Sequence, residues 1–160
     1  MTMSPPDEPS LAVTHEIRDG CVCLHLQRAA RAMARRFDEV FRPLGITNGQ
    51  FSVLVALNRP DPPRLGEVAA LLAMDRTTLT AALKPLARRD LVAVRADPGD
   101  GRSRRLHLTE PGRALLREAV PRWREEHARL AIEHPGLDLE LLRGELRDLA
   151  GLESDAPPVG

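Results

Sequence analysis

The spacing of apolar residues predicts that this chain is mainly helical. Apolar side chains recur every three or four positions in residues 22–41, in residues 114–131 and again in residues 139–149. This is the period of one face of an α-helix, so each stretch is predicted to form an amphipathic helix. The proline at position 121 is expected to bend the second of these helices.

Capping residues mark where several helices begin. Thr47, with Gln50 three positions later, has the pattern of a capping box, and its helix is predicted to end before the prolines of residues 60–63. Asp75 precedes a stripe of leucines at helical spacing, and Thr109 precedes the stretch 114–131, so both are predicted N-caps. A short helix over residues 66–72 is predicted before Asp75.

Two short runs after the leucine stripe, residues 91–95 and 104–108, are typical of strands. They are joined by a loop dense in turn-forming residues, namely Asp97, Pro98, Gly99, Asp100 and Gly101. A β-hairpin is therefore predicted directly after two helices joined by a tight turn at Ala73 and Met74. This is the order of elements in a winged helix-turn-helix, which we place at about residues 63–109.

The length of 160 residues suits a single hydrophobic core. We predict one domain over residues 16–153, mainly α with a small β-hairpin. Residues 1–15 and 154–160 have no sustained hydrophobic period, so both are predicted to be disordered tails.

Composition excludes several classes of protein. No run approaches the roughly 20 apolar residues that span a bilayer, and the start of the chain lacks the pattern of a signal peptide, so we expect a cytoplasmic protein without a membrane partner. Two cysteines are too few for a disulfide framework or a zinc site. The histidines have no ligand spacing, and no nucleophile with a base or phosphate loop is found, so we expect no metal, cofactor or catalytic residue.

The charge is distributed unevenly although the whole chain has a formal net charge of +0. Residues 75–105 hold eight basic and four acidic side chains, a local net charge of plus four, so the remainder carries minus four. A basic helix and hairpin in a neutral chain match the electrostatic footprint of a duplex-binding protein. On charge alone, an ordinary solvated basic helix followed by a hairpin is the better interpretation.

The face of the helix after Asp75 that lies opposite its leucines is polar and basic, with hydroxyl and cationic groups that suit phosphates and base edges. The candidate DNA-binding residues on this helix and on the hairpin are Arg76, Thr77, Thr80, Lys84, Arg88, Arg102 and Arg104.

Two segments, MDRTTLTAALKPLARRDLV at residues 74–92 and DPGDGRSRRLHLTEPGRALL at residues 97–116, resemble the MarR family of bacterial transcription regulators. The resemblance implies a recognition helix in the major groove, with Arg76, Thr77 and Thr80 as readers. It also implies a wing whose Arg102 enters the minor groove, braced by Asp100.

The resemblance further implies a homodimer, built on long helices at about residues 18–42 and 109–152. These helices carry more apolar residues than a small winged domain can cover. Such a dimer would be a repressor that binds a pseudo-palindromic operator in double-stranded DNA.

Two positions depart from the family pattern. Ala81 stands where a larger polar or basic residue is frequent, and Pro85 lies inside the predicted recognition helix, where it removes one backbone donor. These departures support an alternative, a helical dimeric protein-interaction module whose winged domain has lost DNA binding. The retained basic and hydroxyl residues argue against that alternative.

Two kinds of release signal are compatible with the sequence. Cys21 and Cys23 occupy the opening turns of the first predicted helix, where helix-end amides favour a reactive thiolate. The simpler and favoured interpretation is that Cys23 packs as a small apolar residue and Cys21 faces solvent or a neighbouring group. A small-molecule effector is the other candidate, and its pocket would lie near Met33, Phe37, Phe51 and Trp123, although the spacing of these side chains is also that of a core.

Overall fold

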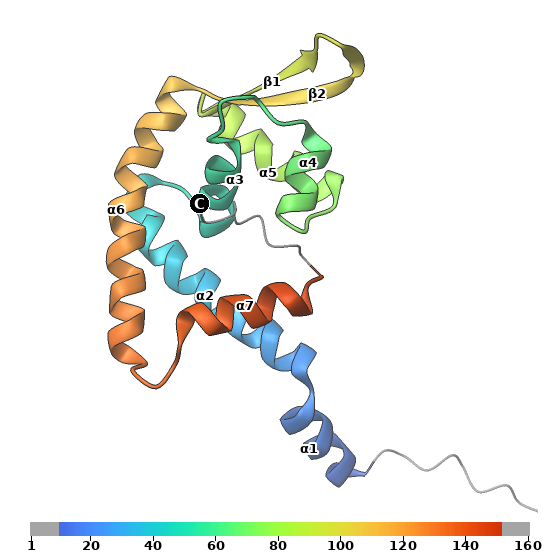
Figure 1. Cartoon of the computed structure of the whole chain (residues 1–160), viewed down its shortest axis with the longest axis vertical. Helices are drawn as coiled ribbons and strands as arrows, with labels where there is room; N and C mark the ends of the chain where they lie inside the picture. Colours follow the sequence, from blue (N-terminus) through green and yellow to red (C-terminus); the bar gives the residue numbers. More distant parts are fainter. Residues whose placement is uncertain (1–9, 152–160) are drawn as a thin grey trace, which may run out of the picture.

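The structure is a computed structural model that describes residues 10–151 (Figure 1). The first helix, α1 (Leu11–Gly20), begins at Ser10, whose side chain accepts a hydrogen bond from the N–H of Val13. The prediction of a tail through residue 15 is therefore wrong for residues 11–15, because this cap starts a helix there. Residues 1–9 of that predicted tail, and the predicted tail 154–160, lie outside the described residues.

A second helix, α2 (Val22–Phe41), follows after a break at Cys21. A 3-10 turn, η1 (Arg42–Leu44), ends at Gly45, which has a φ of 66°. The next helix, α3 (Asn48–Leu57), has the predicted capping box. Gln50 N–H donates to Thr47 Oγ1 at 3.2 Å, and Thr47 N–H donates to Gln50 Oε1 at 3.0 Å.

The predicted helix-turn-helix is confirmed. Helix α4 (Leu65–Leu71) is joined to α5 (Arg76–Arg88) through a turn in which Ala73 has a φ of 50°. The Asp75 carboxylate caps α5 by accepting a hydrogen bond from Thr78 N–H at 2.8 Å. Pro85 is accommodated inside α5, between the buried residues Leu83 and Leu86.

The predicted hairpin is also confirmed, but its strands are longer than expected. Strands β1 (Val92–Asp97) and β2 (Asp100–Leu108) pair antiparallel, from Val92 opposite Leu108 to Asp97 opposite Asp100. The predicted loop of residues 97–101 is therefore too long, because Asp97, Asp100 and Gly101 belong to the strands. Figure 1 shows the hairpin projecting beyond the helices.

Helix α6 (Glu110–Glu133) begins at the predicted cap, where Thr109 Oγ1 accepts a hydrogen bond from Gly112 N–H at 3.1 Å. Helix α7 (Leu139–Leu149) follows, capped by Asp138. Helices α2 and α6 pack against each other, and ion pairs also connect them. The Arg36 guanidinium contacts Glu126 at 2.5 Å and Glu133 at 2.6 Å, and Glu126 is buried.

The core lies where α2, α3, α4, α5, the hairpin and α6 meet. Burial of each large apolar side chain in this core stabilises the folded state by about 1.5–3 kcal/mol. Its largest fully buried side chains are Phe41, Leu54, Leu57, Leu79, Leu86, Leu106, Val53 and Val68.

The two outermost helices of the described chain contribute nothing to this core. Neither α1 nor α7 has a buried residue. Leu11 and Ile17 on α1 are 69% and 58% exposed, and Leu141 and Leu149 on α7 are 61% and 65% exposed. Both helices thus present unpartnered apolar faces. Within residues 10–151, none of the helices has the length and apolarity needed to cross a bilayer.

Candidate nucleic-acid interface

Helix α5 separates its apolar and polar residues cleanly. Leu79, Leu83 and Leu86 are buried against the core. The opposite face is exposed over the whole helix, and it carries Arg76, Thr77, Thr80, Ala81, Lys84 and Arg88. The structure therefore brings all five α5 candidates onto one exposed face.

The threonines of α5 differ in how free their hydroxyl groups are. Thr80 Oγ1 donates to the Arg76 carbonyl oxygen at 2.7 Å, and Thr78 Oγ1 donates to Asp75 Oδ2 at 2.5 Å. The hydrogen bond from Thr78 lowers the pKa of the Asp75 carboxyl. The Thr77 hydroxyl makes no side-chain hydrogen bond within residues 10–151, so it is the hydroxyl most available to an external acceptor.

A cleft of about 400 Å³ lies between the start of α4, the start of α5 and strand β2. The candidates Arg76, Arg102 and Arg104 line it together with Arg64, which sequence reasoning missed. At its floor a Cβ added to Gly66 would lie 3.1 Å from Nη2 of Arg76, so a glycine leaves room for the guanidinium. Four arginines and one carboxylate, Glu67, line this cleft, so its lining carries an excess of positive charge of the kind that attracts phosphates.

A buried aspartate fixes the hairpin to the helix-turn-helix. Asp97 is 4% exposed, and its Oδ2 lies 2.9 Å from Arg64 Nε and 3.1 Å from Arg105 Nε. Its Oδ1 accepts a hydrogen bond from Gly99 N–H at 2.9 Å. The Gly99 N–H, followed by the Arg64 guanidinium, lowers the pKa of the Asp97 carboxyl.

Backbone contacts extend this junction. Leu106 N–H donates to the carbonyl oxygen of Pro63 at 2.9 Å, and Arg64 forms an isolated bridge with Arg105. The segment before α4 is thus held alongside β2. Sequence reasoning treated Asp97 only as a turn former, because its arginine partners are distant in the sequence.

Asp100 contacts its predicted partner, Arg102, through the backbone. Its Oδ1 accepts a hydrogen bond from the backbone N–H of Arg102 at 3.1 Å, and the guanidinium of Arg102 makes no ion pair within residues 10–151. Asp100 therefore fixes the backbone of the wing and leaves the Arg102 side chain free.

Two of the eight basic residues in residues 75–105 make contacts within the protein that stabilise the fold. The Arg89 guanidinium donates to the carbonyl oxygens of Gly45 and Leu44, at 2.5 and 3.1 Å, and Arg105 pairs with Asp97. The other six are exposed and form no ion pair within residues 10–151, namely Arg76, Lys84, Arg88, Arg95, Arg102 and Arg104.

The two cysteines differ in exposure, and only the interpretation of Cys23 is contradicted. Cys21 is half-buried as the N-cap of α2, and its Sγ accepts a hydrogen bond from Leu24 N–H at 3.4 Å. Cys23 is exposed, and its Sγ accepts a hydrogen bond from the Gln27 amide at 3.3 Å. The expectation that Cys23 packs is wrong, because its side chain is exposed on α2, whereas the half-buried Cys21 is compatible with the expectation that it faces solvent or a neighbouring group.

The four aromatic and methionine candidates for an effector pocket do not all meet. Phe51 and Trp123 line an apolar cavity of about 430 Å³ between α3, α4 and α6. Phe37 is 6% exposed in the core, where its ring lies 4.9 Å from that of His127. Neither Phe37 nor Met33 lines this cavity.

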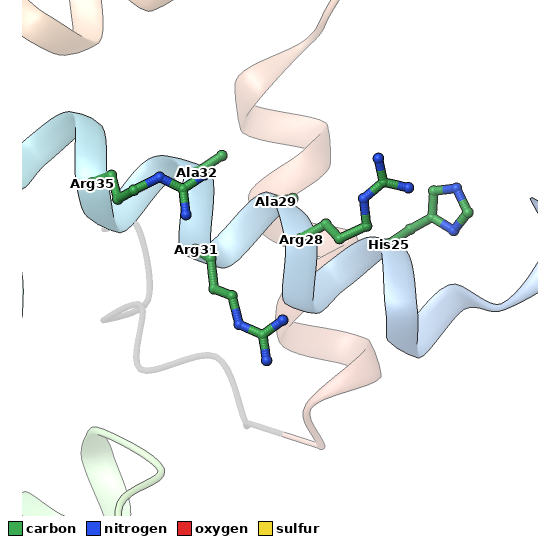
Figure 2. A pocket seen from close by; sticks show the side chains of 6 residues that line it. All are labelled: His25, Arg28, Ala29, Arg31, Ala32 and Arg35. Carbon is green, nitrogen blue, oxygen red and sulfur yellow. The ribbon is translucent and has the colours of Figure 1, made fainter. Parts of the chain in front are cut away.

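A further hollow lies along α2 beside His25, Ala29 and Ala32 (Figure 2). Its charged side chains do not converge, because Arg28 and His25 extend to one side of the helix and Arg31 extends to the other (Figure 2). This hollow therefore offers no convergent set of ligand groups.

The fold and the site define a winged helix-turn-helix protein. Helix α5 and the hairpin of this protein share one exposed basic surface. The profile of the MarR family matches residues 44–103. The chain belongs to the MarR family of transcription regulators.

Individual relatives agree with this assignment. The chain is 37% identical over 76 residues to the HTH-type transcriptional repressor NicR of Pseudomonas putida, a match that covers 48% of each protein. It is also similar to the M. tuberculosis transcriptional regulator MosR in complex with DNA, with 37% identity, a TM-score of 0.71 and coverage of 81% of this chain and 92% of that one. BpsR of Bordetella bronchiseptica, whose DNA binding is regulated by 6-hydroxynicotinic acid, gives 29% identity, a TM-score of 0.70 and coverage of 86% and 96%.

Proposed function

We propose that this chain is a homodimeric, sequence-specific repressor that acts in the cytoplasm and binds a pseudo-palindromic operator in double-stranded DNA. Helix α5 enters the major groove, and the wing carries Arg102 into the adjacent minor groove. One observation carries the proposal: Arg76 of α5 and Arg102 and Arg104 of the wing line the same exposed cleft. A duplex that touches α5 therefore also meets the wing.

The exposed basic side chains of α5 and the hairpin lack ion-pair partners within residues 10–151, and this supports a role in DNA binding. The six exposed cations of α5 and the hairpin are not neutralised by carboxylates within residues 10–151, so each is available to a phosphate or a base. Neutralising them on DNA releases counterions, which is the main source of affinity for a duplex. The repressor name of NicR supports repression as the outcome.

The exposed apolar faces of α1 and α7 support the homodimer. Two short helices with no buried residue are poorly stabilised alone, because most helical stability in proteins comes from packing. A second copy would cover both faces through a two-fold interface. Two recognition helices would then match the two halves of a pseudo-palindrome.

Release of the operator is proposed to follow binding of a small molecule in the apolar cavity beside Phe51 and Trp123. Its volume of about 430 Å³ lies in the range of known ligand sites, and its walls come from α3, from the end of α4 in the helix-turn-helix and from α6. The regulation of BpsR by 6-hydroxynicotinic acid supports this kind of control. Thiol oxidation is a second candidate trigger, which the exposure of Cys23 supports.

Selection of duplexes from a random library by the purified full-length protein tests the proposed function. We expect an inverted repeat to be enriched. On that sequence Arg76→Gln should weaken binding about tenfold or more for each half-site, because a bidentate arginine contact is worth about 1–3 kcal/mol. Arg122→Gln, on an exposed position of α6 outside the cleft, is the matched control and should change nothing. If no duplex is retained even at low salt, the interaction-module alternative is the better description.

A further inference from the structure

Helix α5 contains a proline, Pro85, close to its end. A proline has no N–H, so it cannot donate the hydrogen bond that a helical residue gives to the carbonyl oxygen four positions earlier. In α5 that oxygen belongs to Ala81. No side chain of residues 10–151 donates to it either. The Ala81 carbonyl oxygen therefore lacks its regular helical donor and is available to another one.

Ala81 lies on the side of α5 that faces away from the core. It is two positions from both Leu79 and Leu83, which is about 200° around a helix with 3.6 residues per turn. Both leucines are buried, and Ala81 is exposed. The ring of a proline also crowds the carbonyl group four positions earlier, which favours tilting that group outward from the helix axis. The acceptor is thus on the face of α5 that is proposed to meet DNA.

The side chain at position 81 is a single methyl group, so it does not hold a binding surface away from the backbone. Lys84 and Arg88, three and seven positions later, have long flexible side chains that can extend sideways to phosphates. A base edge can therefore approach the backbone at Ala81. The two departures from the family pattern, Ala81 and Pro85, act on the same backbone oxygen.

The side chains of α5 offer the bases mainly donors. The charged groups of Arg76, Lys84 and Arg88 can only donate. Residues 76–88 include no Asp, Glu, Asn or Gln, so the threonine hydroxyls are the only side-chain oxygens of the helix. In the major groove, donors suit the acceptor atoms of guanine and thymine, whereas the exocyclic amines of adenine and cytosine need an acceptor. The Ala81 carbonyl oxygen is an acceptor of this kind.

We propose that the Ala81 carbonyl oxygen reads one base pair in each half-site, by accepting a hydrogen bond from the exocyclic amine of an adenine or a cytosine. This inference rests on the proposed entry of α5 into the major groove and adds a determinant of specificity to it. Pro85 is a positioning residue, because it withholds the N–H that would otherwise occupy the oxygen. Ala81 contributes its small size, which lets the base edge come close.

Base analogues that lack the amine test this contact. In the operator selected by the native full-length protein, each adenine of the half-site is replaced in turn by purine, and each cytosine by 2-pyrimidinone. Every base pair carries one such amine, so the scan covers every position. At the position read by Ala81 the native protein should lose about fivefold in affinity per half-site, the usual value of a neutral hydrogen bond. The base at that position identifies which amine is bound.

Protein variants separate this contact from the weaker base pairing of the analogues, which affects all variants alike. Pro85→Ala supplies the missing N–H to the Ala81 oxygen, so it should raise the melting temperature and yet abolish the fivefold loss at that position. Ala81→Leu retains Pro85 but holds the base edge away from the backbone, so it should abolish the same loss. Pro121→Ala, the same substitution inside α6, is the matched control and should keep the native pattern.

Two results would overturn the proposal. One is a scan in which the native protein and Pro85→Ala differ at no position. The other is a loss that disappears in Pro85→Ala but persists in Ala81→Leu, which would assign the effect to the shape of the helix and not to the oxygen. In both cases an operator is still selected and bound, so the proposed DNA-binding function stands. Failure to select an operator would instead remove that function together with this contact.

Discussion

The Nε atom of Arg64 lies 2.9 Å from Oδ2 of Asp97, which ties the residue before α4 to the end of β1. Because Arg64 and Arg105 approach the same carboxylate oxygen, one buried group holds both the helix-turn-helix and the second strand of the wing. The position of Arg102 relative to Arg76 thus depends on Asp97, which lines no part of the cleft itself.

Replacing Asp97 with Asn should loosen the wing without removing any cation that meets DNA. We expect a lower melting temperature and weaker operator binding, because two arginines lose their counter-charge in the junction. Asp100→Asn, at the exposed start of β2, is the matched control and should have a smaller effect. Thermal unfolding and DNA titration of both variants measure this. Unchanged binding by Asp97→Asn would show that the junction does not position the wing.

The same carboxylate predicts a pH dependence. The folded state lowers the pKa of Asp97, chiefly through the Gly99 N–H and then through Arg64. Its contribution is therefore complete above the unfolded pKa of about 3.9 and is lost as pH falls through the lower folded value. Unfolding of the native protein should become easier below about pH 4, with a smaller change in Asp97→Asn.

Gly112 marks the tightest junction between the wing and α6. A Cβ at this position would lie 2.1 Å from the carbonyl oxygen of Leu91, which accepts the N–H of Thr109. Gly112→Ala should therefore destabilise the protein by about 1–3 kcal/mol or more. Gly49→Ala is the control, because its Cβ would meet only Thr47 Oγ1 at 3.9 Å, and it should stabilise α3 by about 0.5–1 kcal/mol. Denaturant unfolding distinguishes the two, and equal stabilities would contradict the close packing.

The elements of the fold were predictable because their signals are local. Thr47, Asp75 and Thr109 each cap the helix that follows, and the leucines of α5 fall on its buried face. The lengths of the strands were not predictable, because pairing between Ala96 and Arg104 depends on the partner strand as well as on each run. The start of α1 was missed because its apolar face is short, with Leu11, Val13 and Ile17 in a ten-residue helix that follows a polar, proline-rich stretch.

The candidate site was predictable only in part, for a related reason. The exposed face of α5 follows from helical periodicity, so Arg76 and Thr77 could be named from the sequence. Arg64 and Asp97 are 33 residues apart, and no local pattern indicates that they meet. Likewise the cap formed by Cys21 depends on a break between α1 and α2 that the apolar spacing does not reveal.

The apolar faces of α1 and α7 predict the oligomeric state. Light scattering at low micromolar concentration should give twice the chain mass of 17.6 kDa. Leu141→Glu with Leu149→Glu should shift the protein toward the monomer, because both side chains are exposed here and would be buried by a second copy. Glu140→Gln on the same helix is the control. A native protein that remains monomeric would exclude the dimer.

Oxidation tests the two thiols. Peroxide should lower the operator affinity of the native protein if the exposed Cys23 or the capping Cys21 is the trigger. Cys21→Ser retains an N-cap, so its loss of response would reflect sulfur chemistry and not a damaged helix. Equal loss of affinity by the native protein and by the double Cys→Ser variant would rule out thiol sensing.

Alanine substitutions in the wing and in the recognition helix should weaken DNA binding in different ways. Arg102→Ala removes one free cation from each subunit, and each lost phosphate contact lowers the slope of log affinity against log salt by about one. A dimer should therefore show a slope shallower by roughly two, with weaker binding to operator and random duplex alike. Thr77→Ala releases no counterion, so it should preserve the slope while costing about 1 kcal/mol per half-site on the operator alone.

Thr80→Ala separates the two threonines of α5. Because the Thr80 hydroxyl donates to the Arg76 carbonyl oxygen at 2.7 Å, it has no proton left to donate to a base, and its loss should reduce discrimination less than the loss of Thr77 does. Salt titrations of the three variants on operator and random duplex measure both quantities. If Arg102→Ala leaves slope and affinity unchanged on both duplexes, the hairpin does not contact DNA, and a protein-interaction role for the winged unit becomes the better explanation of its exposed arginines.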